Sequence, residues 1–246
     1  MVRLKDIAAV AGVSVMTVSK ALRDKPDLSS ATKSRVQALA QQMGYVPDAS
    51  ASGLRNRKTR LLGLVIPAPT DPVYSRVLLA LESQAYERGF DLLLAHSLGK
   101  TDREDSVIRR LMSRRVDGVF IAPVYRMASS APIYDDLLKQ GIPTVLLGHR
   151  APFCSQFVNV ETDDLAASSA VTQHLVSLGH RRIAFLAGTT HWPWAQERIE
   201  GYRRGLRDAG IPLDDRLIFH AGSTVEEGAA AAMQFIQENP GATAIQ

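Results

Sequence analysis

The sequence is poor in cysteine and in aromatic residues: it has one cysteine, Cys154, and its aromatic content is 6% of 246 residues. A single cysteine excludes an internal disulfide and fits a reducing compartment. No apolar run approaches the roughly 18 residues that a membrane-spanning helix needs. Also missing are a nucleophile elbow, a Walker sequence, a dinucleotide-binding glycine fingerprint and zinc-ligand spacing. We therefore expect a cytoplasmic protein without metal or cofactor, and not an enzyme.

What the chain does have is a hydrophobic content of 46% and an uneven distribution of charge. Residues 1–60 hold 11 Lys and Arg against 4 Asp and Glu, a net charge of +7. The whole chain has 29 and 25, so residues 61–246 hold 18 and 21, a net charge of −3. This pattern favours an anion-binding module joined to a domain that does not bind anions. Solvated surface charge is the alternative explanation.

The basic end begins with two short amphipathic helices. Leu4, Ile7, Ala8 and Ala11 form the apolar stripe of the first, and Gly12 ends it. Ser14 is a good N-cap for a second helix, in which Val18, Ala21 and Leu22 can pack back against the first. The pattern predicts a helix-turn-helix whose second helix presents an outer face to a DNA groove, made of Val15, Met16, Thr17, Ser19 and Lys20. Any small helical hairpin remains the alternative from periodicity alone.

A third helix follows, capped by Ser29, with an apolar stripe at Val36, Leu39, Ala40 and Met43 and a stop at Gly44. After it the chain has the small-residue segment 48–54 and the basic run 55–60. The body from Leu61 alternates short apolar runs with helical segments. The expected strands are 61–66, 90–95, 116–122, 143–147, 182–187, 217–220 and 242–246, and the expected helices are 73–88, 102–114, 133–140, 165–178, 195–209 and 225–237. Buried strands joined by helical crossovers predict an α/β, doubly wound parallel sheet.

Several short motifs follow one another along the chain: Lys5-Asp6-Ile7-Ala8, Ala11-Gly12-Val13-Ser14, Thr17-Val18-Ser19 and Gly44-Tyr45-Val46-Pro47, and further on Arg115-Val116-Asp117-Gly118, Gly141-Ile142-Pro143 and Leu178-Gly179-His180-Arg181-Arg182-Ile183. Through these motifs the chain resembles the lactose-repressor (LacI) family of bacterial transcription regulators over its whole length. The resemblance implies a helix-turn-helix domain at 1–47, a hinge or linker at 48–60, and a bilobed periplasmic-binding-protein-like core. The two lobes of the core are expected at 61–150 and 151–246, the second incomplete.

The resemblance also implies which residues bind. We expect the DNA contacts at Ser14, Val15, Met16, Thr17, Ser19, Lys20, Ser29, Thr32, Tyr45 and Leu54. Leu54, a lone large apolar residue at the end of the hinge, is the candidate to wedge between base pairs.

The effector should bind at the carboxyl ends of the strands, in the cleft of the core. Arg198 matches the family's effector-contacting arginine, and its guanidinium can hold two oxygens of a sugar or carboxylate. Trp192 and Trp194 offer flat faces for a sugar ring, with ordinary loop packing as the alternative. The expected effector-binding residues are Val73, Tyr74, His149, Trp192, Trp194, Arg198 and Ser223. The acidic residues Glu161, Asp163 and Asp164 could suggest a metal, but carboxylates at the start of a helix usually only favour its dipole.

Three features depart from the family's pattern. Asp48 and the weak helix formers after it suggest a hinge that folds only on DNA. Lys20 replaces a commoner arginine and cannot make the arginine's bidentate guanine contact. The chain stops at Gln246, where the family continues for roughly another third and supplies an aspartate facing the effector. A partial sequence or a truncated product would then leave Arg198 as a buried cation without a partner, and effector binding should be weak or absent.

The sequence is thus most consistent with a sequence-specific DNA-binding repressor controlled by a sugar or related metabolite and acting as a homodimer on double-stranded operator DNA. The alternatives are a truncated member that binds DNA but no effector, an exported sugar receptor, and a sugar-processing enzyme. The hypothesis of an exported receptor does not explain the basic residues 1–60, and such a protein would need an export signal. The enzyme would need an acid–base or cofactor constellation that the sequence does not show.

Overall fold

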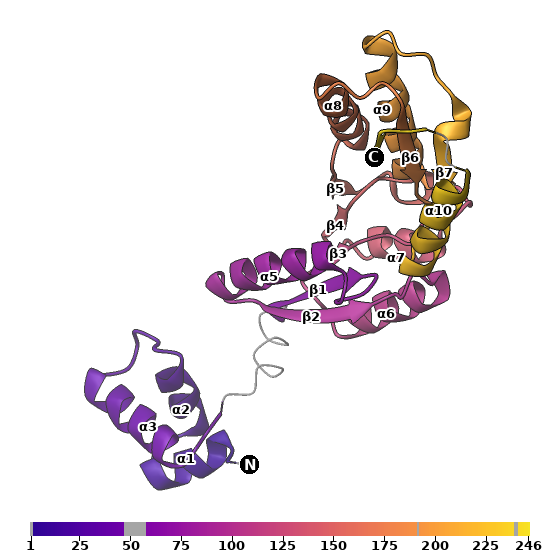
Figure 1. Cartoon of the computed structure of the whole chain (residues 1–246). Helices are drawn as coiled ribbons and strands as arrows, with labels where there is room; N and C mark the ends of the chain where they lie inside the picture. Colours follow the sequence, from indigo (N-terminus) through magenta and orange to yellow (C-terminus); the bar gives the residue numbers. More distant parts are fainter. Residues whose placement is uncertain (1, 47–57, 191, 239–240) are drawn as a thin grey trace. The chain divides into compact units, whose positions relative to one another are not determined.

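The computed structural model describes residues 2–46, 58–190, 192–238 and 241–246. The chain divides into two compact units, Met1–Thr59 and Arg60–Gln246, whose elements are labelled in Figure 1. The division falls next to the expected end of the linker at residue 60. Within the described residues, no helix combines the length and the apolar character needed to cross a membrane.

In its described residues, 2–46 and 58–59, the first unit contains three helices: α1 (Leu4–Ala11), α2 (Val15–Leu22) and α3 (Ser30–Gln42). Gly12 ends α1 with a φ of +63°, in the left-handed region that glycine adopts without strain. The predicted serine caps are present, because Ser14 accepts from Thr17 N and Ser29 accepts from Thr32 N. The three helices share one small core, which consists of Ile7, Ala8, Ala11, Val18, Ala21, Val36 and Ala40.

The second unit begins with a five-stranded parallel sheet in the order β2-β1-β3-β4-β5. Its strands are β1 (Leu61–Ile66), β2 (Asp91–His96), β3 (Gly118–Ile121), β4 (Thr144–Leu147) and β5 (Val158–Val160). The connecting helices are α5 (Pro72–Glu87), α6 (Thr101–Ser113) and α7 (Pro132–Lys139). Figure 1 shows α5 on one face of this sheet and α6 on the other.

Alternate residues of the strands feed two separate apolar clusters, one on each face of the sheet. Leu64 and Ile66 of β1 pack with Tyr74 and Leu78 of α5. Val65, between them, belongs to the other cluster, with residues of α6 and α7. Both faces of the sheet are therefore covered, as the continuous apolar runs predicted.

The rest of the second unit is a three-stranded parallel sheet in the order β7-β6-β8, with its helices. The strands are β6 (Ile183–Ala187), β7 (Ile218–His220) and β8 (Ala244–Ile245), and the helices are α8 (Asp164–Ser177), α9 (Pro193–Asp208) and α10 (Val225–Glu238). Ile199, Tyr202 and Leu206 of α9 pack against β6. The α/β class and the two parallel sheets are confirmed.

The expected lobe boundary at residue 150 needs a correction. Val158–Val160 pairs in parallel with β4, so the first sheet includes a strand that we had assigned to the second lobe. The expectation relied on the break in apolar pattern at 151–157, which is a short 3-10 helix, Pro152–Cys154, and its flanks. A three-residue strand with both valines exposed gives too short a pattern to be recognised in a sequence.

Candidate DNA-binding and effector sites

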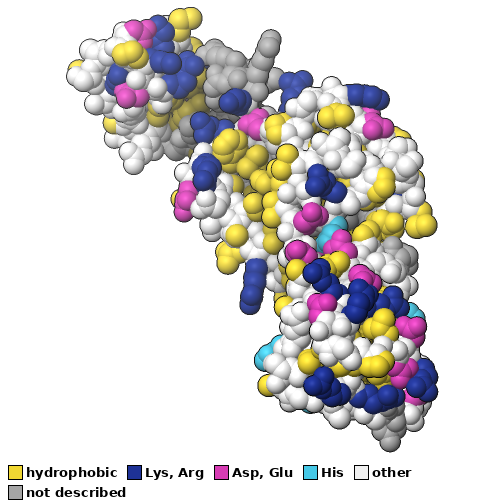
Figure 2. Space-filling model, turned by 90° about the horizontal axis from the view of Figure 1, so that it is seen from above, with side chains coloured by type: hydrophobic (Ala, Val, Ile, Leu, Met, Phe, Trp, Pro, Cys, Tyr) yellow, Lys and Arg dark blue, Asp and Glu magenta, His cyan; other side chains and the backbone are white. Residues whose placement is uncertain are grey.

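Helix α2 presents its first residues to solvent and buries its opposite side. Val15 and Met16 are 46% and 69% exposed, whereas Val18 and Ala21 are fully buried against the other two helices. The face of this unit drawn in Figure 2 carries Lys and Arg side chains beside fewer acidic ones. Large apolar side chains left in solvent at the start of a helix suit contact with a thymine methyl group.

The polar residues predicted on α2 already have partners within this unit. Ser14 Oγ lies 2.9 Å from Thr17 Oγ1, and Ser19 Oγ accepts from Arg23 Nη2 at 2.9 Å. The Lys20 ammonium is paired with Asp27. Both Lys20 and Asp27 are well exposed, and such pairs contribute little and exchange readily.

The remaining predicted DNA contacts differ in their surroundings. Ser29 and Thr32 form the N-terminal cap of α3, with their hydroxyl oxygens 2.9 Å apart. Tyr45 packs against the core of the first unit. Leu54 lies outside the described residues, so its predicted role remains a prediction.

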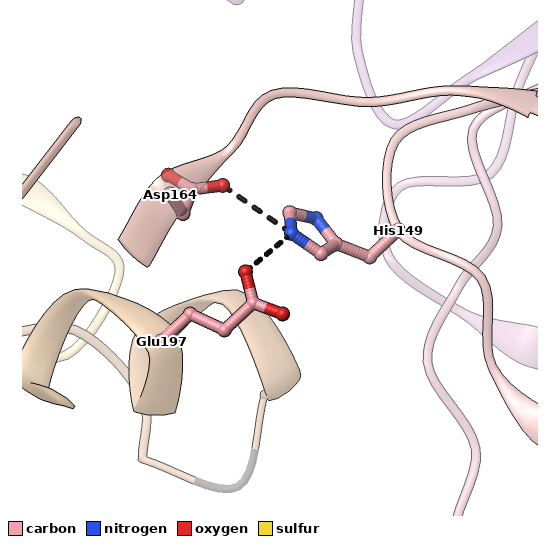
Figure 3. A group of neighbouring side chains, drawn as sticks. All are labelled: His149, Asp164 and Glu197. Carbon is pink, nitrogen blue, oxygen red and sulfur yellow. Dashed lines mark hydrogen bonds and ion pairs between the residues drawn. The ribbon is translucent and has the colours of Figure 1, made fainter. Parts of the chain in front are cut away.

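In the second unit, one group of contacting side chains comes from the loop after β4 and from helices α8 and α9. His149 follows β4, while Asp164 begins α8 and Glu197 lies in the second turn of α9. His149 Nε2 lies 3.0 Å from Glu197 Oε2 and 3.5 Å from Asp164 Oδ2. Figure 3 shows the imidazole ring pointing between the two carboxylates. The side chains of His149 and Asp164 are 11% and 8% exposed, so the contact between these two residues is largely shielded from solvent.

Arg198 is adjacent to this group and has a partner. Its Nε donates to Asp164 Oδ1 at 2.6 Å. Thr162 Oγ1 donates to the other oxygen, Oδ2, at 3.0 Å. The side chain of Arg198 is 55% exposed, so the expectation of a buried cation without a partner is wrong. The reason is that Asp164, which we had interpreted only as a helix-dipole residue, supplies the carboxylate.

Trp194 lies beside His149, and Trp192 lies beside Trp194. The ring centroids of Trp194 and His149 are 5.9 Å apart, and those of Trp192 and Trp194 are 5.0 Å apart. A cavity of about 360 Å³ reaches His149 and is lined by His149, Glu161, Thr162, Asp163, Leu165 and Glu197. The structure thus brings His149, Trp192, Trp194 and Arg198 together.

The other predicted effector residues have different surroundings. Val73 is 66% exposed at the start of α5, and Tyr74 packs on the core of the first sheet, where burial raises the pKa of its hydroxyl. Ser223 is exposed, and its backbone N–H donates to Glu227. Sequence reasoning missed Asp164 and Glu197 as site residues. The available signal for Glu197 was its position next to Arg198.

Comparison with known proteins agrees with this architecture. A family model described as "Bacterial regulatory proteins, lacI family" matches residues 3–48. A second, "Periplasmic binding proteins and sugar binding domain of LacI family", matches residues 59–246. The ribose operon repressor of Escherichia coli (strain K12) is 32% identical over 215 residues, which are 87% of this chain and 64% of the relative. The regulator DegA of Bacillus subtilis is 28% identical over 95% of this chain and 69% of its own length.

Solved structures of transcriptional regulators have a similar fold. A complex of the transcriptional regulator CelR with cellobiose is 29% identical and has a TM-score of 0.67, with 100% of this chain and 73% of that one covered. The lac repressor dimer bound to operator and the anti-inducer ONPF has a TM-score of 0.82 over 99% of this chain and 72% of that one, and at 23% identity it supports the fold. The chain spans about two thirds of the length of the curated relatives. With both family models matched in order, the chain belongs to the LacI family of bacterial transcriptional regulators.

Proposed function

We propose that this chain is a sequence-specific DNA-binding repressor whose affinity for its operator is set by a small-molecule effector, a sugar or a related metabolite. The observation that carries the proposal is the pairing of a basic helix-turn-helix unit with an α/β unit of sugar-binding type in one chain. The relatives named above are regulators rather than enzymes. A repressor of this kind would act in the cytoplasm, where bacterial operator DNA lies.

The DNA-reading part of the proposal rests on α2. Exposed Val15 and Met16 can select bases only by apolar contact, above all with thymine methyl groups. Lys20, released from Asp27, supplies a charged donor, while the other basic residues of this unit give affinity through phosphates. Two such units in a homodimer would read two half-sites, and the second contact would gain from effective concentration.

The effector-binding part rests on Arg198 and the two tryptophans. Because Asp164 holds Arg198 through Nε, the guanidinium is oriented before any ligand arrives. More than half of its side chain is exposed, so it can donate to sugar hydroxyl or carboxylate oxygens. Trp192 and Trp194 provide apolar ring faces nearby, which suit the C–H face of a sugar. The relatives' names point to sugars such as ribose and cellobiose as first ligands to test.

The experiment is a selection from randomised double-stranded DNA with the full chain, followed by binding titrations with and without a panel of sugars. The double variant Val15→Ala/Met16→Ala should fold normally and select a different operator. The control Val10→Ala, which removes a 62% exposed valine from α1, should select the wild-type site. An unchanged preference in the double variant would contradict the assignment of α2. A sugar that alters operator affinity in wild type but not in Arg198→Met would support the effector site.

A further inference from the structure

A single imidazole nitrogen faces two carboxylates in the second unit. Both dashed lines in Figure 3 end on Nε2 of His149, one from Glu197 and one from Asp164. A ring nitrogen carries at most one hydrogen, so it can donate a full hydrogen bond to only one of the two oxygens at a time. The second carboxylate then faces the same nitrogen without a hydrogen from it, although Asp164 Oδ2 also accepts from Thr162 Oγ1. A cation bound by all three atoms would satisfy the whole group.

The distances within the group suit such a cation. The nitrogen and the two carboxylate oxygens lie within 4.8 Å of one another. Metal–ligand bonds of about 2.0–2.2 Å place neighbouring ligand atoms of a tetrahedral or octahedral ion about 2.8–3.6 Å apart. The separations from Nε2 are 3.0 Å to Glu197 and 3.5 Å to Asp164. The two separations from Nε2 therefore suit a bound ion, and the side chain of Glu197, which is 41% exposed, can adjust the oxygen–oxygen separation.

Neighbouring groups hold the candidate ligands in place and supply charge. Arg198 occupies Asp164 Oδ1, and Thr162 donates to Oδ2, so the orientation of this carboxylate is fixed. The adjoining cavity is lined by two further acidic residues, Glu161 and Asp163. The four carboxylates outweigh the single positive charge of Arg198, and the local field favours a cation.

We propose that His149, Asp164 and Glu197 bind one divalent transition-metal ion, such as Zn²⁺, Mn²⁺, Co²⁺ or Ni²⁺. One imidazole nitrogen with two carboxylate oxygens is a ligand set that these borderline ions accept, whereas Mg²⁺ and Ca²⁺ prefer oxygen alone. The ion would lie against the proposed effector pocket, and its remaining coordination positions would be open to water or to hydroxyl oxygens. Only this last placement rests on the proposed function.

The test is a metal titration of the full chain without DNA and without sugar, after treatment with a chelator and its removal. Zn²⁺, Mn²⁺, Co²⁺ and Ni²⁺ are added separately, and binding is measured by calorimetry. Co²⁺ and Ni²⁺ should also quench tryptophan fluorescence, because the Trp194 ring lies 5.9 Å from that of His149. Because neither DNA nor effector is present, failure here is distinguishable from failure of the proposed function.

The expected result is one ion per chain, with affinity lowered about tenfold or more in His149→Gln and in Glu197→Gln. Matched controls are His174→Gln, an exposed histidine of α8, and Glu200→Gln, which lies one turn after Glu197 in α9. Both controls should bind as wild type does. Glu197 is 41% exposed, so its variant keeps the fold even if His149→Gln does not. No binding at millimolar metal, or binding unchanged in Glu197→Gln, would overturn the proposal.

Discussion

At the scale of single residues, the α/β unit contains a buried ion pair between helix α6 and the segment that follows β3. Glu104 is fully buried, and its Oε1 accepts from Val124 N at 2.7 Å and from the Tyr134 hydroxyl at 3.0 Å. Arg126 pairs with its other oxygen and also with Asp105. Burial raises the pKa of Glu104, although Val124, Arg126 and Tyr134 act to lower it. Removal of one partner should therefore lower the free energy of unfolding by more than the intact pair contributes to it.

We predict that Arg126→Met destabilises the α/β unit by about 3–5 kcal/mol at neutral pH, because Glu104 would be left buried and charged. Arg109→Met, a change at an exposed arginine of α6, should cost less than about 0.5 kcal/mol. A carboxyl whose folded pKa is raised contributes stability below its ordinary value, here 4.5, and loses that contribution as pH rises through the raised value. The deficit of Arg126→Met should therefore shrink as pH falls towards 4.5, which urea denaturation at several pH values would measure. A deficit independent of pH would contradict this account.

The residues of the proposed effector site show which contacts could be predicted from the sequence and which could not. The motif match identified Arg198, and strand-end placement suggested His149, but neither indicated Asp164, which lies 34 residues from Arg198. Asp163 lies at the start of α8, where a carboxylate favours the helix dipole as expected, and it also caps the helix by accepting from Ala166 N. The side chain of Asp164, the next residue, is buried and contacts Arg198 and His149 instead. Two adjacent aspartates at a helix start have the same sequence signature, and only the packing of α9 against α8 distinguishes them.

At the scale of elements, that packing depends on two glycines of α9. A Cβ at Gly201 would lie 2.3 Å from Leu165 O, and one at Gly205 would lie 2.6 Å from Thr172 Cβ. Helices α8 and α9 therefore approach each other through a face of small residues, which also includes the buried Ser168 and Ser169. This close approach sets the distance between Asp164 and Arg198.

We predict that Gly201→Ala separates the two helices and destabilises their lobe by about 1–3 kcal/mol through overpacking. The matched control is Gly228→Ala in α10, where a Cβ would meet nothing within 4 Å. It should be neutral or stabilising by up to about 1 kcal/mol, because alanine restricts the unfolded chain. Tryptophan fluorescence during urea unfolding reports on this lobe, since Trp192 and Trp194 lie at the start of α9. Equal stability of the two variants would show that α8 can shift at little cost.

Most helices and strands could be predicted within two residues of their observed ends, for identifiable reasons. Helix starts carry explicit chemistry: Ser14 caps α2, and Asp71 caps α5 ahead of Pro72. The strands of the first sheet are continuous apolar runs because helices cover both faces. The strand β5 escaped prediction because its pairing with β4, rather than its own pattern, makes it a strand.

At the scale of the whole chain, the two parts carry opposite net charges and should therefore differ in their affinity for DNA. Residues 1–60 carry a net +7 and residues 61–246 a net −3. Each unit has its own apolar core, so each can be tested apart from the other. A polyanion such as DNA should therefore be attracted to the first unit and repelled weakly by the second.

We predict that a fragment of residues 60–246 binds the selected operator far more weakly than the full chain does. For the full chain, log affinity should fall linearly with log salt concentration, with a slope of about −0.9 for each phosphate neutralised. The double variant Lys5→Ala/Arg23→Ala, at two exposed basic residues of the first unit, should make this slope shallower if both contact phosphates. Arg109→Ala/Arg110→Ala, at two exposed arginines of α6, is the matched control and should leave the slope unchanged. Fluorescence anisotropy with labelled operator across a salt series measures the affinity and the salt slope of the full chain, the fragment and both double variants. A fragment lacking residues 1–59 that binds as tightly as the full chain would refute the assignment of DNA binding to the helix-turn-helix unit.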